Sequence, residues 1–335
     1  MNRVVQLLLG AGVSALCVWL SMKDVHVAEV MAALRGANGL GFVMVMAITL
    51  LGFWLRAFRW RYFIEAGRPL SQASLFSATM IGFMANNVLP FRLGEFIRPW
   101  ALARRERLPK TTLLATVVVE RTVDMLTLLG IFGVTMVIHP IAESTDAGRL
   151  VQWGARVLVA LCVALTLFVI AVERNRALAK SVVRFVTSPL PGDGRERAAR
   201  MLEHFLEGLG SFRDLGRLSV VFAISFAMFL CFAWALAVSL WSLGITLPWY
   251  AGLVLLVITA IGIMVPAAPG YIGTLNIACT AGLALFGVGK AQSVPFSWFY
   301  FFSQWLPITA VGLIYLNREG LSLRSLGSAG GGGSA

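Results

Sequence analysis

Long apolar runs, separated by short polar segments, follow one another along almost the whole chain. A helix needs about 20 residues to cross the roughly 30 Å hydrocarbon core of a bilayer, and six runs fit full membrane spans of that kind. The six expected spans cover approximately Val4–Leu20, Leu40–Leu55, Leu113–Ile138, Leu150–Val172, Val220–Leu243 and Phe296–Leu316. The pattern predicts an all-α polytopic membrane protein.

Two further stretches consist of paired short apolar runs with a polar, helix-breaking segment between them. The pairs are Leu75–Ala85 with Phe96–Leu102, and Trp249–Val265 with Tyr271–Phe286. Proline cannot donate to the helical ladder, and broken backbone at membrane depth survives only inside protein or beside a cavity. We therefore predict two re-entrant helical hairpins, about residues 72–103 and 249–287. The predicted break or hinge residues are Pro90, Gly94, Pro266, Pro269, Gly270 and Gly273.

Positive charges support this layout. If both hairpins return to the side from which they enter, most of the 28 lysines and arginines fall on one side, which the positive-inside rule makes cytoplasmic. Both chain termini are then cytoplasmic, and the two hairpins dip from opposite sides. The sequence thus predicts an inverted repeat whose broken helices meet near the bilayer midplane, as in many transporters.

A single transmembrane domain is expected over residues 1–320. Between its spans, residues 195–216 carry a helical apolar seam of Leu202, Phe205, Leu209 and Phe212, which predicts a cytoplasmic amphipathic helix on the membrane surface. Residues 321–335 form a tail that ends in a glycine-rich linker.

Composition excludes most soluble classes. The 335 residues are 58% hydrophobic and 13% charged, about half the charged share of soluble domains. The net charge of +12 follows the topology, so no nucleic-acid partner is expected. Phosphate loops, metal-ligand pairs and nucleophile triads are missing from the sequence. We expect no metal, no cofactor and no catalytic residue, which favours a transporter over an enzyme.

The candidate binding residues cluster at the two breaks and at the start of the third span. If the chain is helical after Pro90, then Arg92, Glu95 and Arg98 share one face, and the new helix offers unpaired N–H groups to an anion. The other candidates for substrate contact are Asn86, Asn87, Glu120, Arg121, Asp124, Thr274 and Asn276.

Structural alternatives stand beside this hypothesis. The three arginines and three acids near the first break and third span can neutralise one another as a buried network. Asn86 and Asn87 can cap the broken helix instead of touching a ligand. The arginines at the end of the second span, Arg56, Arg59 and Arg61, are expected to anchor it at the membrane interface.

Three motifs resemble a known family. Asn87-Val88-Leu89-Pro90-Phe91-Arg92-Leu93-Gly94-Glu95-Phe96-Ile97-Arg98 is similar to the N-x-x-P-x-R-x-G-E-x-x-R signature of the lysylphosphatidylglycerol synthase transmembrane family, also called flippase-like membrane proteins. Glu120-Arg121-Thr122-Val123-Asp124 and Pro266-Ala267-Ala268-Pro269-Gly270-Tyr271-Ile272-Gly273 resemble its E-R-x-x-D and P-x-x-P-G-x-x-G segments. Asn276 departs from the family, which often has Glu there.

The resemblance implies lipid handling. In the best-known relatives this module resembles a flippase for aminoacylated phosphatidylglycerol, and we expect a stand-alone member without the soluble aminoacyl-transfer domain. The expected substrate is an anionic, phosphate-bearing lipid, aminoacylated or isoprenoid-linked, in the bacterial inner membrane. A proton or sodium ion is the expected coupling ion, and an oligomer is compatible with the sequence. The alternatives are a membrane-embedded transferase or accessory subunit of lipid-linked glycan synthesis, and a small-anion transporter.

Overall fold

The computed structural model describes residues 12, 16–22, 25–64, 68–89, 92–139, 153, 156–157, 160, 215–264 and 269–322. Regular secondary structure in these ranges is helical, and no strand occurs in them. Four of their helices are long and apolar enough to cross a membrane: Gly39–Phe63, Lys110–Ile138, Gly216–Ser242 and Lys290–Arg318. The prediction of an all-α polytopic membrane protein is confirmed.

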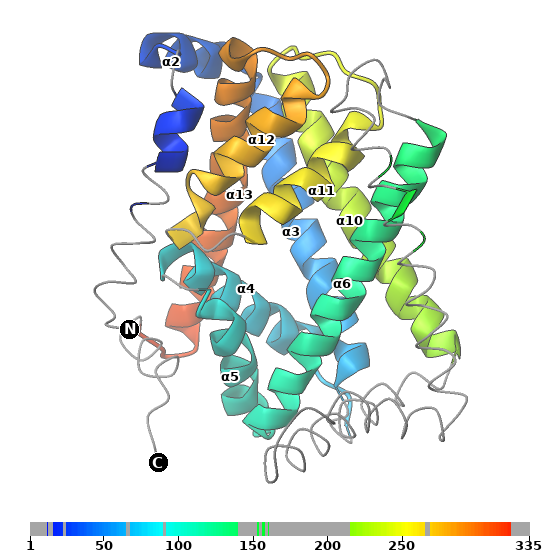
Figure 1. Ribbon diagram of the computed structural model, residues 1–335. Helices are drawn as coiled ribbons and strands as arrows, with labels where there is room; N and C mark the ends of the chain where they lie inside the picture. Colours follow the sequence, from blue (N-terminus) through cyan, green and yellow to red (C-terminus); the bar gives the residue numbers. More distant parts are fainter. Residues whose placement is uncertain are drawn as a thin grey trace, which may run out of the picture. The chain divides into compact units, whose positions relative to one another are not determined.

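The helices follow the predicted order (Figure 1). Most are longer than predicted, whereas α11 and α12 are a few residues shorter. They are α2 (Val27–Gly36), α3 (Gly39–Trp60), η1 (Arg61–Phe63), α4 (Gln72–Val88), α5 (Gly94–Glu106), α6 (Lys110–Ile138), α10 (Leu215–Ser242), α11 (Ala251–Met264), η2 (Pro269–Tyr271), α12 (Thr274–Ala284) and α13 (Lys290–Arg318). The sequence had not predicted α2. Most of the spans expected at Val4–Leu20 and Leu150–Val172, and nearly all of the amphipathic helix expected at 195–216, lie outside the described residues.

The chain separates into two compact units. The first contains Met1–Val117 and Ser225–Ala335, so it unites helices from both ends of the sequence, and the second contains Val118–Ile224. The described parts of the second unit are mainly the later portion of α6 and the beginning of α10. One domain over residues 1–320 stays a prediction, and each unit is considered by itself below.

In the first unit, α13 is the helix on which the others are assembled. It packs against α2, α3, α4 and α12, and it tolerates Pro295 and Pro307 in its interior. Polar side chains also join it to its neighbours, since Gln304 Nε2 on α13 donates to Thr49 Oγ1 on α3 at 2.7 Å. Interhelical hydrogen bonds of this kind hold membrane helices together where apolar burial gives little driving force.

Small residues allow the close packing of the first hairpin, α4 and α5. A Cβ on Gly94 would lie 1.8 Å from the Gly82 carbonyl oxygen, and one on Gly82 would lie 2.5 Å from Arg98 Cβ. The two backbones therefore approach closely at this crossing, as small residues permit in membrane helices. Apolar side chains then fill the space around the hairpin, among them the fully buried Met84 and Ile97.

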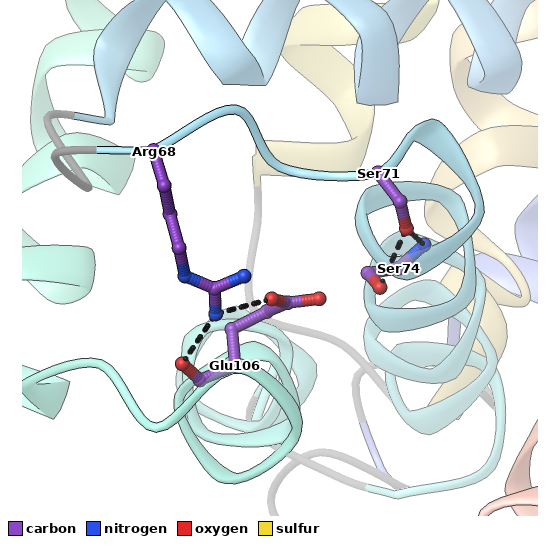
Figure 2. Close-up of polar contacts among 4 residues, drawn as sticks. All are labelled: Arg68, Ser71, Ser74 and Glu106. Atoms are coloured by element: carbon purple, nitrogen blue, oxygen red, sulfur yellow. Dashed lines mark hydrogen bonds and ion pairs between the residues drawn. The ribbon is translucent and has the colours of Figure 1, made fainter.

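Polar contacts hold together the end of the same hairpin at which α4 begins and α5 ends (Figure 2). Arg68, just before α4, donates to the Glu106 carboxylate at 2.8 Å and to the Glu106 main-chain oxygen at 3.0 Å, at the end of α5. Ser71 caps α4 by accepting from the Ser74 N–H at 3.1 Å. The first hairpin is thus fixed at the end opposite to its break.

Candidate functional site

The two broken segments meet inside the first unit. The first break separates α4 from α5 at residues 89–93, and the second separates α11 from α12 at residues 265–273; η2, within the second break, packs against α4. We call the place where they meet the junction, and define it by Asn87, Arg92, Ile263, Gly270, Tyr271 and Trp305. The predicted breaks Pro90 and Pro266 lie outside the described residues.

Arg92 connects the two breaks directly. Its Nη2 donates to the main-chain oxygen of Ile263 in the last turn of α11, and its guanidinium lies over the Tyr271 ring, 5.3 Å from the centroid. The carbonyl oxygens of a helix's last turn have no partner within the helix and carry its negative dipole end, so a cation there is favourable. The Glu95 carboxylate lies 4.0 Å from Nη1, and 33% of the Arg92 side chain remains exposed.

The amino end of α5 differs from the expectation. Asn86 Oδ1 accepts from the Gly94 N–H at 2.8 Å, and the N–H groups of the next three residues donate to the main-chain oxygens of Arg92 or Leu93. All four N–H groups of the first turn are therefore used within the chain. The expectation that this helix end offers unpaired N–H groups to an anion is wrong, and the structure gives Asn86 the contact of a helix cap.

Asn87 and the second break are also held by amide side chains. Asn87 Nδ2 donates to Thr309 Oγ1 on α13 at 3.0 Å. Asn276 Oδ1 accepts from the Gly273 N–H at 3.1 Å, and its Nδ2 donates to Ser297 Oγ at 2.8 Å. Asn276 is fully buried and both ends of its amide are occupied. In this arrangement Asn276 joins α12 to α13.

Glycine is required in the second break for conformation and for space. Gly270 has φ of 73° and Gly273 has φ of 89°, a region that side chains disfavour. A Cβ on Gly270 would also lie 3.1 Å from the indole nitrogen of Trp305 on α13 and 3.4 Å from the Asn87 main-chain oxygen. Thr274 follows these glycines and is buried, with its hydroxyl donating to the Tyr271 main-chain oxygen at 3.2 Å.

The Arg98 side chain packs against α3. Only 3% of Arg98 is exposed, and its guanidinium lies 3.9 Å from the centre of the Trp60 ring on α3. Two further arginines, Arg56 and Arg59 of α3, are 6% and 0% exposed. Arg59 Nη1 donates to Ser225 Oγ at 2.6 Å. Arg56 and Arg59 were expected to anchor the span at the membrane interface, but both side chains are instead buried against other parts of the protein. Only Arg61, which stacks on Phe58 at 4.4 Å, remains partly exposed.

The third predicted cluster belongs to α6 within the second unit. Glu120 and Asp124 are 1% and 4% exposed, and Arg121 Nη1 lies 3.6 Å from Asp124 Oδ2, one turn along the same helix. Buried acids with a basic neighbour on their own helix fit the structural-network alternative.

The Ile263 main-chain oxygen is a part of the site that the sequence did not predict. A main-chain carbonyl has no side-chain signature, so only the position of the α11 end reveals it. Tyr271 and Trp305 are aromatic residues that could have indicated a ligand path, but aromatic residues in membrane spans are commonly packing residues.

The chain is similar to known proteins over most of its length. The family model described as the lysylphosphatidylglycerol synthase TM region matches residues 7–312. Glycosyltransferase AglD of Haloferax volcanii is 28% identical to this chain over 137 residues, which are 41% of this chain and 22% of that protein. The matched region is thus less than a quarter of that relative's length.

Proposed function

The chain belongs to the lysylphosphatidylglycerol synthase transmembrane family, and from this premise we propose that it translocates an anionic, phosphate-bearing lipid across the bacterial inner membrane. The headgroup is aminoacylated or the tail is isoprenoid-linked, and both termini face the cytoplasm. The protein acts as a transporter without catalytic residues, and a proton or sodium gradient supplies energy for any uphill movement.

One observation carries the proposal, namely the partly exposed cation between two broken helices. Arg92 has 33% of its side chain exposed, contacts the end of α11 and lies over Tyr271. Broken helices that meet within a membrane protein are the common form of a transporter's binding site. An arginine there suits a phosphate, because its planar guanidinium binds phosphate oxygens through two parallel hydrogen bonds.

Exposed apolar side chains beside the junction favour a lipid over a small anion. Phe96, in the first turn of α5, is 56% exposed, and Ile261 and Met264 in the last turn of α11 are 60% and 55% exposed. These side chains suit hydrocarbon chains that remain in the bilayer while the headgroup reaches Arg92. A site for a small soluble anion needs no such apolar border.

The alternative is a membrane-embedded transferase or accessory subunit of lipid-linked glycan synthesis. The similarity to a protein named glycosyltransferase supports it, although the match covers only 22% of that protein. A transferase forms product in detergent, where translocation has no meaning. Product formation from a lipid-linked sugar by the purified chain in detergent would favour this alternative.

The test compares Arg92→Ala, Arg92→Lys and the control Arg104→Ala, an exposed arginine on α5, the helix that follows the break. Native mass spectrometry measures co-purifying lipids, and proteoliposomes with fluorescent phosphatidylglycerol measure translocation. We expect selective retention of an anionic lipid by the wild type and the control, its loss with Arg92→Ala, and partial retention with Arg92→Lys. Equal lipid retention and transport by Arg92→Ala and the wild type would refute the role of Arg92.

A further inference from the structure

We propose that the contact between Arg92 and the second break is a latch, which opens when the phosphate of an anionic lipid takes the Arg92 guanidinium away from Ile263 and Tyr271. The proposal rests on the lipid-transport function above and adds how the ligand releases the site. In the latched state, the cation that would bind the substrate is held by the protein itself.

Backbone strain is concentrated at this contact. Among the described residues other than glycine, only Arg92, Arg107 and Tyr271 have positive φ, at 53°, 55° and 61°. Arg107 ends α5 in the left-handed conformation, which is common at helix ends. Arg92 and Tyr271 instead face each other across the two breaks, 5.3 Å from guanidinium carbon to ring centre. Such strain persists only where surrounding contacts impose it, and it is frequent at clamps and switches.

The latch uses only some of the hydrogen-bond donors of the Arg92 guanidinium. Nη2 donates to the Ile263 oxygen, and Nη1 lies 4.0 Å from the Glu95 carboxylate, which is longer than a hydrogen bond. Nε is buried and has no hydrogen-bond partner within the described part of the chain. A phosphate can accept from Nε and one Nη together, so the ligand offers what the latch does not.

Other donors at the first break are already occupied. The first-turn N–H groups of α5 donate within the chain, and the Asn87 amide donates to Thr309. A phosphate arriving there therefore competes mainly for Arg92. When it binds, the hydrogen bond and the ring contact that join the two breaks are both lost, so ligand binding is coupled to separation of the breaks.

This coupling predicts the sign of a substitution effect. If a latched state competes with the ligand, weakening the latch raises the apparent affinity, because a larger fraction of the protein is ready to bind. Tyr271→Leu removes the ring under the guanidinium but leaves Arg92 intact. From the usual strength of cation–π contacts, the apparent Kd should fall about 2- to 30-fold. Tyr271→Phe keeps the ring and is the matched control, with little change expected.

The binding experiment titrates full-length protein in phosphatidylcholine nanodiscs with short-chain phosphatidylglycerol, and uses short-chain phosphatidylcholine as the neutral comparison. Tighter binding by Tyr271→Leu than by the wild type and Tyr271→Phe supports the latch. Unchanged binding overturns it. Weaker binding also overturns it, since Tyr271 would then be a ligand contact.

A distance measurement separates the latch from the transport function. Spin labels on Phe96→Cys and Ile261→Cys, both exposed positions, in a background without native cysteines, report the separation of α5 and α11. We expect a longer distance with phosphatidylglycerol, and a longer distance in Tyr271→Leu even without it. If the wild type binds the lipid with no change in distance, the latch fails while the proposed function stands. If no anionic lipid binds but Tyr271→Leu still separates the labels, the proposed function and the opening by a lipid phosphate both fail, and only the holding of the two breaks by Arg92 and Tyr271 remains. If neither occurs, both fail.

Discussion

Replacing Gly94 by alanine tests whether the two helices of the first hairpin must touch at their backbones. The new Cβ would lie 1.8 Å from the Gly82 carbonyl oxygen and 2.5 Å from Asn86 Oδ1. The first obstacle is main chain, which cannot rotate away. The second is the side chain that caps α5 through the Gly94 N–H. The helices must therefore separate, or the cap must leave.

The expected cost follows from these two effects. Overpacking of a tight contact costs about 1–3 kcal/mol, and the lost hydrogen bond from Gly94 to Asn86 adds about 0.5–1.5 kcal/mol. The better helix propensity of alanine returns at most about 1 kcal/mol. The net destabilisation is about 1–4 kcal/mol, which lowers Tm by several degrees in a chain of this size.

The assay is thermal unfolding in detergent, followed by tryptophan fluorescence. Gly130→Ala is the matched control, because Gly130 lies in the helical α6 and a Cβ there would meet nothing within 4 Å. Gly82→Ala should lower Tm as well, since its Cβ would lie 2.5 Å from Arg98 Cβ. The two losses should not add, because both changes open the same contact. A Gly94→Ala protein with the Tm of the wild type would refute the reasoning.

Three further changes test polar contacts by the same assay. Asn276→Asp keeps an acceptor for the Gly273 N–H but removes the donor to Ser297 and buries a carboxylate. The stability should therefore fall by about 1–3 kcal/mol or more. Trp60→Phe removes the indole donor to Thr116, 2.9 Å away, while keeping an aromatic face, and should cost about 1–2 kcal/mol. Glu319→Gln removes the charge from the 2.7 Å ion pair between Glu319 and Arg105 on α5. The loss of stability should be at most about 1 kcal/mol and should vanish at high salt.

Each of these expectations has an outcome that contradicts it. A stable Asn276→Asp protein would mean that its amide does not hold α12 on α13. A Trp60→Phe protein with unchanged Tm would mean that the indole hydrogen bond contributes nothing. A Glu319→Gln effect that persists at high salt would show that packing, and not charge, decides the contribution of this residue.

For the described helices from α3 onward, the sequence alone was sufficient for their order and for the position of the breaks, although it did not predict α2. Long apolar runs specify membrane helices because every main-chain polar group must be satisfied within the bilayer, and proline and glycine interrupt that ladder locally. These are short-range effects, so α4, α5, α11 and α12 were predicted to within a few residues. Capping by Asn86 is equally local, and it was one of the two roles considered for that residue.

The tertiary structure decided which groups meet. Arg92 is 171 residues from the carbonyl it contacts at Ile263, and Asn87 is 222 residues from Thr309. Burial of Arg59 against Ser225, 166 residues away, was equally unforeseen. Periodicity assigns a residue to one face of its own helix, but the partner of that face depends on how helices from both ends of the chain pack. The apolar pattern therefore determined where the helices break, and the packing of α4, α11 and α13 determined that the two breaks share one arginine.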